Sequence, residues 1–348
     1  MKKYLLLTLL ALLNFVMAVA QEPYAVFNNG TLTFYYDNAK NERQGTVYDL
    51  NIGYIAPDWT NDQSVAQSIY KVVFHTSFAD ARPVSTCRWF SVDVENNKTS
   101  SLSTIEGIEN LNTSCVTTMA AMFYGCSVLT TLDLSHFDTS NVTDMQSMFY
   151  RCNRLTTLNL NHFDTSNVTN MCMMFYGCAW LAMLDLSYFD TRNVTNMAAM
   201  FGSCSNLTTI NCGGNWNTDH LESSLNMFME CTSLVGGKGT HYDVSHLDAA
   251  YAHVDGGSDN PGYLTDNWTY AHFLDGTLTF YCDKKKYERQ GTVYELNSRN
   301  NSPGWSDITP TPRSCSTPPL PMQDLFQPLD GFTMTKHPLS PLLKVLRI

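Results

Sequence analysis

A hydrophobic pattern that repeats every 26 residues dominates the middle of the chain. Met-Phe pairs recur at residues 122–123, 148–149, 174–175 and 200–201, and a cysteine follows each pair at Cys126, Cys152, Cys178 and Cys204. A fifth copy, with Met227, Phe228 and Cys231, comes one residue late. A fixed period of this length is typical of stacked repeats, in which each unit completes its core only against its neighbours.

One unit can be read as a short strand followed by a short helix. In LTTLDLSHF, the alternation around Leu132 and Leu134 predicts a strand with both leucines facing inward. The spacing of the apolar residues between Val142 and Phe149 fits one side of a helix, with Asn141 as its N-cap. The predicted fold class is therefore α/β, a leucine-rich-repeat-like solenoid of strand plus short helix units, flanked by β-hairpin segments.

The periodic sulfur-containing side chains are predicted to fill the core. An identical position in every unit suits a small apolar residue, so we expect the five periodic cysteines to be buried free thiols, and disulfides between units are the alternative. The methionine stripe is likewise interpreted as core filling. The cysteines show no metal-ligand spacing, and we expect no metal site and no cofactor.

Polar residues recur on the outward side of the predicted strands. We predict that this exposed strand face binds the ligand, through Asp133, Ser135, Asn159, Asn161, Asp185 and Ser187. A second series, Asp138, Asp164 and Asp190, follows the inward phenylalanines and is expected to accept hydrogen bonds from turn amides. Calcium binding by these stacked carboxylates is the alternative.

A longer duplication frames the repeats. Residues 25–51 return at 271–297, and the strand-like TLTFYY and TVYDL flank a polar segment, which predicts a β-hairpin in each copy. The expected organisation begins with a signal peptide at residues 1–20, an N-terminal hairpin and leading segment at 21–100, and the solenoid at 101–235. A glycine-rich cap or linker at 236–267, the start of a second N-terminal module at 268–306, and a tail at 307–348 follow.

Charge and leader sequence narrow the function classes. The net charge of −11 and the lack of a basic patch argue against nucleic-acid binding. Lys2 and Lys3 precede an apolar run that ends in Ala18-Val19-Ala20, which is the layout of a Sec-type secretory signal peptide. We expect a protein that is secreted or held at the cell surface, without a membrane span in the mature chain. No catalytic motif is present, so we expect no catalytic residues and no enzymatic activity.

The repeat units carry a family resemblance. MFYGCSVLTTLDLSHFDTSNVTDM and MFYRCNRLTTLNLNHFDTSNVTNM, with the flanking GTLTFYYD and LVGGKGTHYDVSH, resemble the BspA-type leucine-rich-repeat surface proteins of bacteria. The resemblance implies a non-enzymatic surface adhesin whose partner is a host matrix or plasma protein, or a glycan. The alternative is a structural surface spacer or a self-associating surface-layer component without a specific ligand.

The C-terminal tail differs from the rest of the chain. Residues 299–348 hold 9 of the 13 prolines. With suitable codons, RSCSTPPL at 313–320 reads VVFDTSF in a shifted frame, close to VVFHTSF at 72–78. We therefore hypothesise that residues 307–348 are a frameshifted, disordered tail.

Overall fold

The computed structural model describes residues 21–93, 99–266, 269–274, 277–282, 292–295 and 345–347. The chain forms two compact units, Met1–Asn267 and Trp268–Ile348. The predicted signal peptide and most of the predicted tail lie outside the described residues. Within the described part of the chain, no helix has the length and apolarity needed to cross a membrane.

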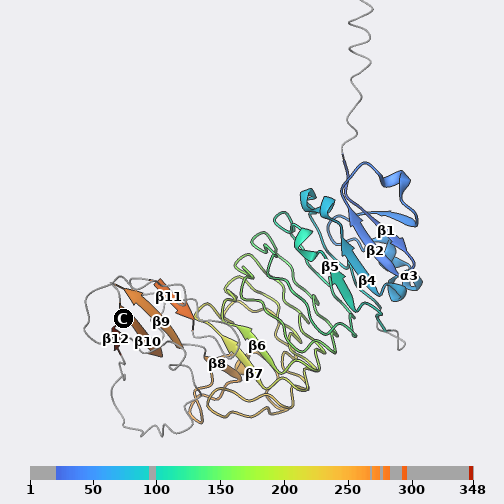
Figure 1. Ribbon diagram of the computed structural model, residues 1–348. Helices are drawn as coiled ribbons and strands as arrows, with labels where there is room; N and C mark the ends of the chain where they lie inside the picture. Colours follow the sequence, from blue (N-terminus) through green and yellow to red (C-terminus); the bar gives the residue numbers. More distant parts are fainter. Residues whose placement is uncertain are drawn as a thin grey trace, which may run out of the picture. The chain divides into compact units, whose positions relative to one another are not determined.

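The first unit begins with a five-stranded sheet in the order β3-β1-β2-β4-β5 (Figure 1). Its strands are β1 Tyr24–Asn28, β2 Thr31–Tyr35, β3 Thr46–Asp49, β4 Lys71–Phe74 and β5 Thr104–Glu106. Asn29 and Gly30, at φ 46° and 76°, form the tight turn between β1 and β2. Two positive φ angles define the turn type that matches the twist of antiparallel strands, and Asn-Gly is the pair that adopts it most readily.

The predicted pairing of TLTFYY with TVYDL is wrong. β2 and β3 do not pair with each other, because both pair with β1, with Tyr24 opposite Tyr35 on one side and opposite Asp49 on the other. The Asn29–Gly30 turn folds β2 back onto β1, so the chain crosses to the far side of β1 before β3 begins. Residues 36–45 make this crossing and are called the crossing loop below.

Short helices and a group of aromatic side chains complete this end of the unit. The helices are α2 Asp58–Asn61, α3 Gln63–Ser68 and the 3-10 turns η1 Lys40–Glu42, η2 Thr76–Asp80 and η4 Ile108–Asn110. The buried Phe34 ring stacks on Phe74 at 4.7 Å and on Trp89 at 4.9 Å between ring centroids. The indole N–H of Trp59 donates to the carbonyl of Trp89, so the large rings leave no unpaired polar atom behind.

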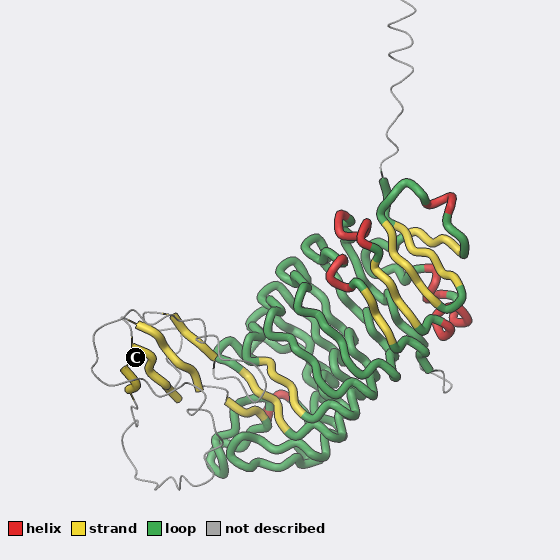
Figure 2. Tube along the Cα trace, in the orientation of Figure 1, coloured by secondary structure: helices red, strands yellow, loops and turns green. Residues whose placement is uncertain are grey.

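The predicted fold class, an α/β leucine-rich-repeat-like solenoid of strand plus short helix units, is wrong. The structure is mixed α/β with very few helices, and residues 111–235, here called the repeat stack, contain turns and loops where helices were predicted (Figure 2). Within the repeat stack only β6 Met183–Leu186 and β7 Thr209–Cys212 are strands.

The segment predicted as a helix is a run of turns instead. We call residues 117–126 and their equivalents in each unit, or rung, the turn segment. Met122, Tyr124 and Cys126 donate their N–H groups three residues back, whereas the residues between them donate to the next rung, as Phe123 does to Met148 at 2.9 Å. A helix would use all of these N–H groups internally, and none would be left to join the rungs.

A left-handed residue interrupts the backbone of every turn segment, which is therefore not helical. Its φ lies between 51° and 58° at Ala121, Ser147, Met173, Ala199 and Asn226. Because this conformation costs a non-glycine residue roughly 1–2 kcal/mol, the contacts around it must compensate.

Neighbouring rungs lie side by side with equivalent residues in register. Parallel bridges link Thr118 to Asp144, Asp144 to Asn170, and Asn170 to Asn196. The buried Phe123 and Phe149 rings stack at 5.8 Å with their planes 3° apart, and the series continues to Phe228. The two methionines that recur in the first four turn segments are also fully buried, from Met119 and Met122 to Met197 and Met200. The prediction that the methionine stripe fills the core is confirmed.

The asparagine predicted to be a helix cap joins rungs instead. The side-chain amide of Asn141 donates to the carbonyl of Ser114 in the preceding rung, at 2.8 Å. Asn167 and Asn193 make the same bond one and two rungs later. The asparagine therefore recurs because it connects neighbouring rungs, and a periodic polar residue of this kind looks like a cap in the sequence.

The far end of the first unit closes the stack. β8 Leu264–Asp266 pairs in parallel with β7, and the 3-10 turn η5 is Ala249–Tyr251. The buried carboxylate of Asp255 accepts the N–H groups of Lys238, Thr240 and Gly257 at 2.7 to 3.0 Å, and the Thr240 hydroxyl at 2.7 Å. A single side chain thus holds together the loops of residues 236–257.

The second unit repeats the pairing of the first three strands. Its sheet has the order β11-β9-β10-β12, with β9 Thr269–Leu274, β10 Thr277–Cys282, β11 Thr292–Glu295 and β12 Val345–Arg347. Tyr270 lies opposite Tyr281 and Glu295, as Tyr24 lies opposite Tyr35 and Asp49. In the place that parallel β4 takes beside β2, β12 lies antiparallel to β10.

Candidate binding surface

The strand segment of each rung, residues 128–136 and their equivalents, presents one side to solvent. Along β6, Leu184 and Leu186 are fully buried while Met183 is exposed and Asp185 half-buried. This alternation follows the two-residue period of an extended chain, with every second side chain in the core. The outward positions of successive rungs form the candidate binding surface.

The structure exposes four of the six residues predicted for this surface. Asp133 and Ser135 are exposed in the first rung, and Asn159 and Asn161 in the second. In the third rung, Asp185 is half-buried. The prediction of an exposed Ser187 is wrong, because only 9% of this residue is accessible.

Two contacts explain the burial of Ser187. Its hydroxyl donates to Asp185 Oδ1 at 2.5 Å, which turns the side chain back toward its own rung. Gly213 in the next rung packs on its backbone so closely that a Cβ there would lie 1.9 Å from the Ser187 carbonyl oxygen. Ser187 is therefore covered where Ser135 and Asn161 are open.

The acidic and amide side chains of the surface hold their own turns. The Oδ1 atoms of Asp133, Asn159 and Asp185 accept the N–H two residues ahead, at 3.0 to 3.1 Å. The N–H and side chain of Ser135 lower the pKa of Asp133 by hydrogen bonding to its ionised form. These side chains therefore shape the loop of their own rung.

The second acidic series is confirmed as turn-forming. Asp138, Asp164 and Asp190 accept the N–H groups of Ser140, Ser166 and Arg192 at 2.9 to 3.2 Å. The Arg192 guanidinium also donates to Asp190, and its hydrogen bonding is the main cause that lowers the pKa of that carboxyl. Each carboxylate is occupied within its own rung, and the described residues contain no group of three or more acidic, histidine or cysteine side chains that could hold a metal ion.

Three exposed apolar side chains in the third rung were missed by the sequence analysis. The accessible fractions of Trp180, Met183 and Tyr188 are 61%, 48% and 39%. The second rung has Arg154, Thr157 and His162 at the same positions. The detectable signal was a break in the repeat, because apolar residues replace polar ones at three outward positions of a single rung.

The periodic cysteines are unsuited to nucleophilic chemistry. All five are buried free thiols, as predicted, and each donates its S–H to a phenylalanine carbonyl in the preceding rung, as Cys152 does to Phe123 at 3.3 Å. Burial raises the pKa of Cys126 and of Cys204 to about 12. The thiols therefore remain protonated and act as second donors to carbonyl groups that also accept a backbone N–H, as the Phe123 carbonyl accepts that of Cys126.

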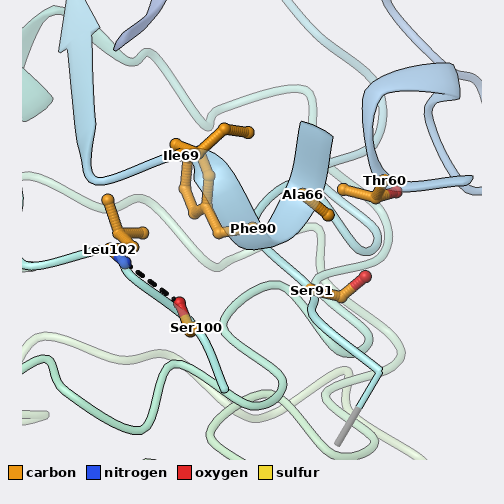
Figure 3. Close-up of a pocket in the computed structure, with 7 residues that line it drawn as sticks. All are labelled: Thr60, Ala66, Ile69, Phe90, Ser91, Ser100 and Leu102. Carbon is orange, nitrogen blue, oxygen red and sulfur yellow. Dashed lines mark hydrogen bonds between the residues drawn. The ribbon is translucent and has the colours of Figure 1, made fainter. Parts of the chain in front are cut away.

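A small cavity lies beside α3 in the aromatic end of the unit (Figure 3). It is lined by Ala66, Ile69, Phe90 and Leu102, together with Thr60, Ser91 and Ser100. Its volume of about 10 Å³ is the space of a single water molecule. This cavity cannot accept an organic ligand.

Comparison with known proteins places the repeats in a family without an assigned activity. Stacked rungs with a sealed core and an open outer surface define the class as a repeat protein. The chain belongs to the family described as Mycoplasma protein of unknown function, DUF285, which matches residues 93–158 and 154–266, half of the chain. No curated protein and no solved structure matches it.

Proposed function

We propose that this chain is a non-enzymatic binding protein, secreted or held at the cell surface, that contacts its partner with the strand segments of the repeat stack. The observation that carries the proposal is the exposed group of Trp180, Met183 and Tyr188 in the third rung. Tryptophan and tyrosine are enriched at protein interfaces, where large, rigid side chains give most of the binding energy.

The surroundings of these side chains support a protein partner. Polar residues such as Asp133, Asn159 and Asn161 are exposed on the strand segments of the two preceding rungs. Apolar anchors combined with polar positions are the usual composition of a protein interface. Burial of the three side chains would remove apolar area from water at roughly 25 cal/mol per Å².

The family resemblance gives the partner class to test first. The BspA-type surface proteins imply a host matrix or plasma protein, or a glycan. The purified chain should bind at least one member of a panel of immobilised matrix and plasma proteins in a surface-plasmon-resonance assay.

The third rung can be altered with little risk to the fold. The variant W180R/M183T/Y188H copies the residues that the second rung already carries at these positions. We expect it to lose at least tenfold in affinity with an unchanged melting temperature. Leu225→Ala is the matched control, since it removes an exposed apolar side chain from a turn segment.

The outcomes separate binding from a passive structural role. Binding that survives the triple variant would place the contact elsewhere on the chain. Absence of binding across the panel, together with concentration-dependent self-association in analytical ultracentrifugation, would instead support a spacer or surface-layer component.

A further inference from the structure

A second, chemically different hollow lies on the N-terminal sheet. It has a volume of about 600 Å³, is open to solvent, and is bordered by β1, β2 and the crossing loop. Small-ligand sites commonly enclose 300–1,000 Å³, so the hollow has the size of such a site. Its polar side chains include Asn28, Thr31, Thr33, Glu42 and Gln44, with Tyr70 beside them.

The crossing loop is fixed in place by a network beside the hollow. Asp37 accepts the Tyr24 hydroxyl at 2.6 Å and the Arg43 guanidinium at 2.5 Å. Arg43 also lies over the Tyr35 ring, 3.9 Å from its centroid. Gly45 at φ 126° ends the loop, where a Cβ would lie 2.4 Å from the Phe27 carbonyl oxygen. The loop is therefore preorganised rather than dependent on a ligand for its shape.

One aromatic ring is held at the edge of the hollow. The Tyr70 N–H donates to the Gly30 carbonyl at 2.9 Å, and a Cβ at Gly30 would lie 2.6 Å from the Tyr70 ring. The ring thus rests against glycine backbone on one side, and half of the residue stays exposed. An aromatic ring fixed in this way gives a ligand a flat apolar platform.

The charges of the hollow favour a neutral ligand. Arg43 is the cation in its wall, and Asp37 neutralises it. Glu42 is exposed at the wall and would repel a phosphate or carboxylate. The Glu42, Gln44 and Asn28 side chains have no hydrogen-bond partner within the described residues, so their donors and acceptors are available to a ligand.

We propose that this hollow is a binding site for a neutral saccharide. Sugar hydroxyls would donate to Glu42 and exchange hydrogen bonds with Gln44 and Asn28, while a C–H face of the sugar ring lies on Tyr70. The site is separate from the strand-segment surface and does not depend on its function.

The internal duplication provides a further reason for this assignment. GTLTFY and ERQGTVY recur unchanged in the second copy, whose strands keep the same register. Arg43 and Gly45 hold the crossing loop, whereas the side chains of Glu42 and Gln44 make no hydrogen bond within the described residues. Saccharide binding accounts for the retention of these two residues. Leu274 takes the place of Asn28 in the second copy. We therefore expect a saccharide to make only some of the same contacts with the second copy as with the first.

The test uses the full chain on an array of neutral, sialylated and sulfated oligosaccharides, followed by calorimetry with the best neutral binder. Gln44→Ala and Tyr70→Ala should each weaken binding at least tenfold. Lys40→Ala is the matched control, because Lys40 lies in the same loop and pairs with Asp49 outside the hollow. Circular dichroism of each variant verifies that the sheet is folded.

Three outcomes would overturn the proposal. They are binding of anionic oligosaccharides only, no saccharide binding at all, and neutral binding that W180R/M183T/Y188H abolishes while Gln44→Ala leaves it intact. The last result would assign the saccharide to the strand-segment surface, and protein binding by that surface would be unaffected by Gln44→Ala. The two proposals can therefore fail separately.

Discussion

The turn segment and the strand segment of one rung connect to their neighbours in different ways. In the turn segment, N–H groups at alternate residues donate to the next rung, with lengths of 2.7 to 3.0 Å from Met119 to Gly125. Between the strand segments of the first two rungs the links are sparse, and the Thr156 N–H reaches the Thr130 carbonyl only at 3.4 Å, whereas β6 and β7 of the next two rungs pair as parallel strands. The turn segment therefore joins the rungs, which leaves the strand segment free to change its outward residues.

The side chains show the same contrast. Phenylalanine occupies one turn-segment position from residue 123 to 228, and its rings stack throughout. The outward strand-segment position holds Val128, Arg154, Trp180 and Asn206 in four successive rungs. Variation is tolerated where side chains face water, and we place binding there for this reason.

The largest expected effect is the loss of a stacked ring. Phe149→Ala leaves a cavity between Phe123 and Phe175 and should lower the free energy of unfolding by about 3–5 kcal/mol. Met183→Ala removes a comparably large side chain from the exposed strand segment and should cost under about 0.5 kcal/mol. Urea unfolding followed by circular dichroism measures both. Equal losses would remove the contrast between the two segments.

Asp255 should give the loops after the last rung a pH-dependent stability. Burial alone would raise the pKa of Asp255. The hydrogen bonds from Thr240, Gly257 and Lys238 together lower it by more than burial raises it, so the pKa lies well below the usual value for an aspartate. Because the folded-state pKa is depressed, its stabilisation is complete above about pH 4 and is lost as the pH falls below that value.

Asp255→Asn should cost about 2–4 kcal/mol at pH 7, because an amide N–H₂ would face backbone donors. The variant should also flatten the decline in melting temperature between pH 5 and pH 2. Asp259→Asn, at an exposed position nearby, is the control and should leave the profile unchanged. A wild-type profile matched by that of Asp255→Asn would disprove this role.

A smaller effect is expected from the thiols. Cys152→Ala removes one of the two donors to the Phe123 carbonyl and a buried sulfur atom, and should cost about 1–2 kcal/mol, whereas Cys115→Ala at an exposed site should be neutral. With its pKa raised by burial, Cys152 should resist alkylation at pH 8 until the chain unfolds, while Cys115 reacts at once. Peptide mass spectrometry after labelling distinguishes them. Rapid native labelling of Cys152 would contradict the buried arrangement.

The smallest expected effect concerns backbone strain. Met173 has a left-handed φ of 55° in its turn segment, so Met173→Gly should stabilise the chain by about 0.5 kcal/mol. The same change at Met183, in β6, should destabilise it by about 0.5–1 kcal/mol. A higher melting temperature for Met173→Gly and a lower one for Met183→Gly would support the left-handed backbone at Met173. A lower melting temperature for both variants would refute it.

Much of the core could be predicted from the sequence, because a 26-residue period marks every inward position. The conformation of the turn segment could not. Met119, Met122, Phe123 and Cys126 have the spacing of one helix face, and successive three-residue turns bring the same positions inward. Whether the segment forms a helix or a run of turns depends on which carbonyls accept its N–H groups. These carbonyls lie about 25 residues away in the sequence, as Met148 does from Phe123, so the local pattern does not reveal them.

The candidate surfaces were predictable only in part. Alternation correctly exposes Asp133 and Asn159, but the burial of Ser187 depends on Gly213 in the next rung. The hollow of the N-terminal sheet depends on β3 pairing with β1, whereas the spacing of TLTFYY and TVYDL suggested a direct hairpin. Both misses involve contacts between segments that local patterns do not encode.

Deletion of one whole rung tests most directly whether the turn segments carry the fold. Removal of residues 145–170 deletes one full period of 26 residues, so Met171 takes the place of Met145 and the turn segments stay in register. Removal of residues 145–157 deletes half a period and puts the following turn segments out of register. We expect the first variant to keep a cooperative urea transition and native circular dichroism, and the second to lose both. Loss of cooperative unfolding in the whole-rung deletion, to the same extent as in the half-rung deletion, would contradict the account.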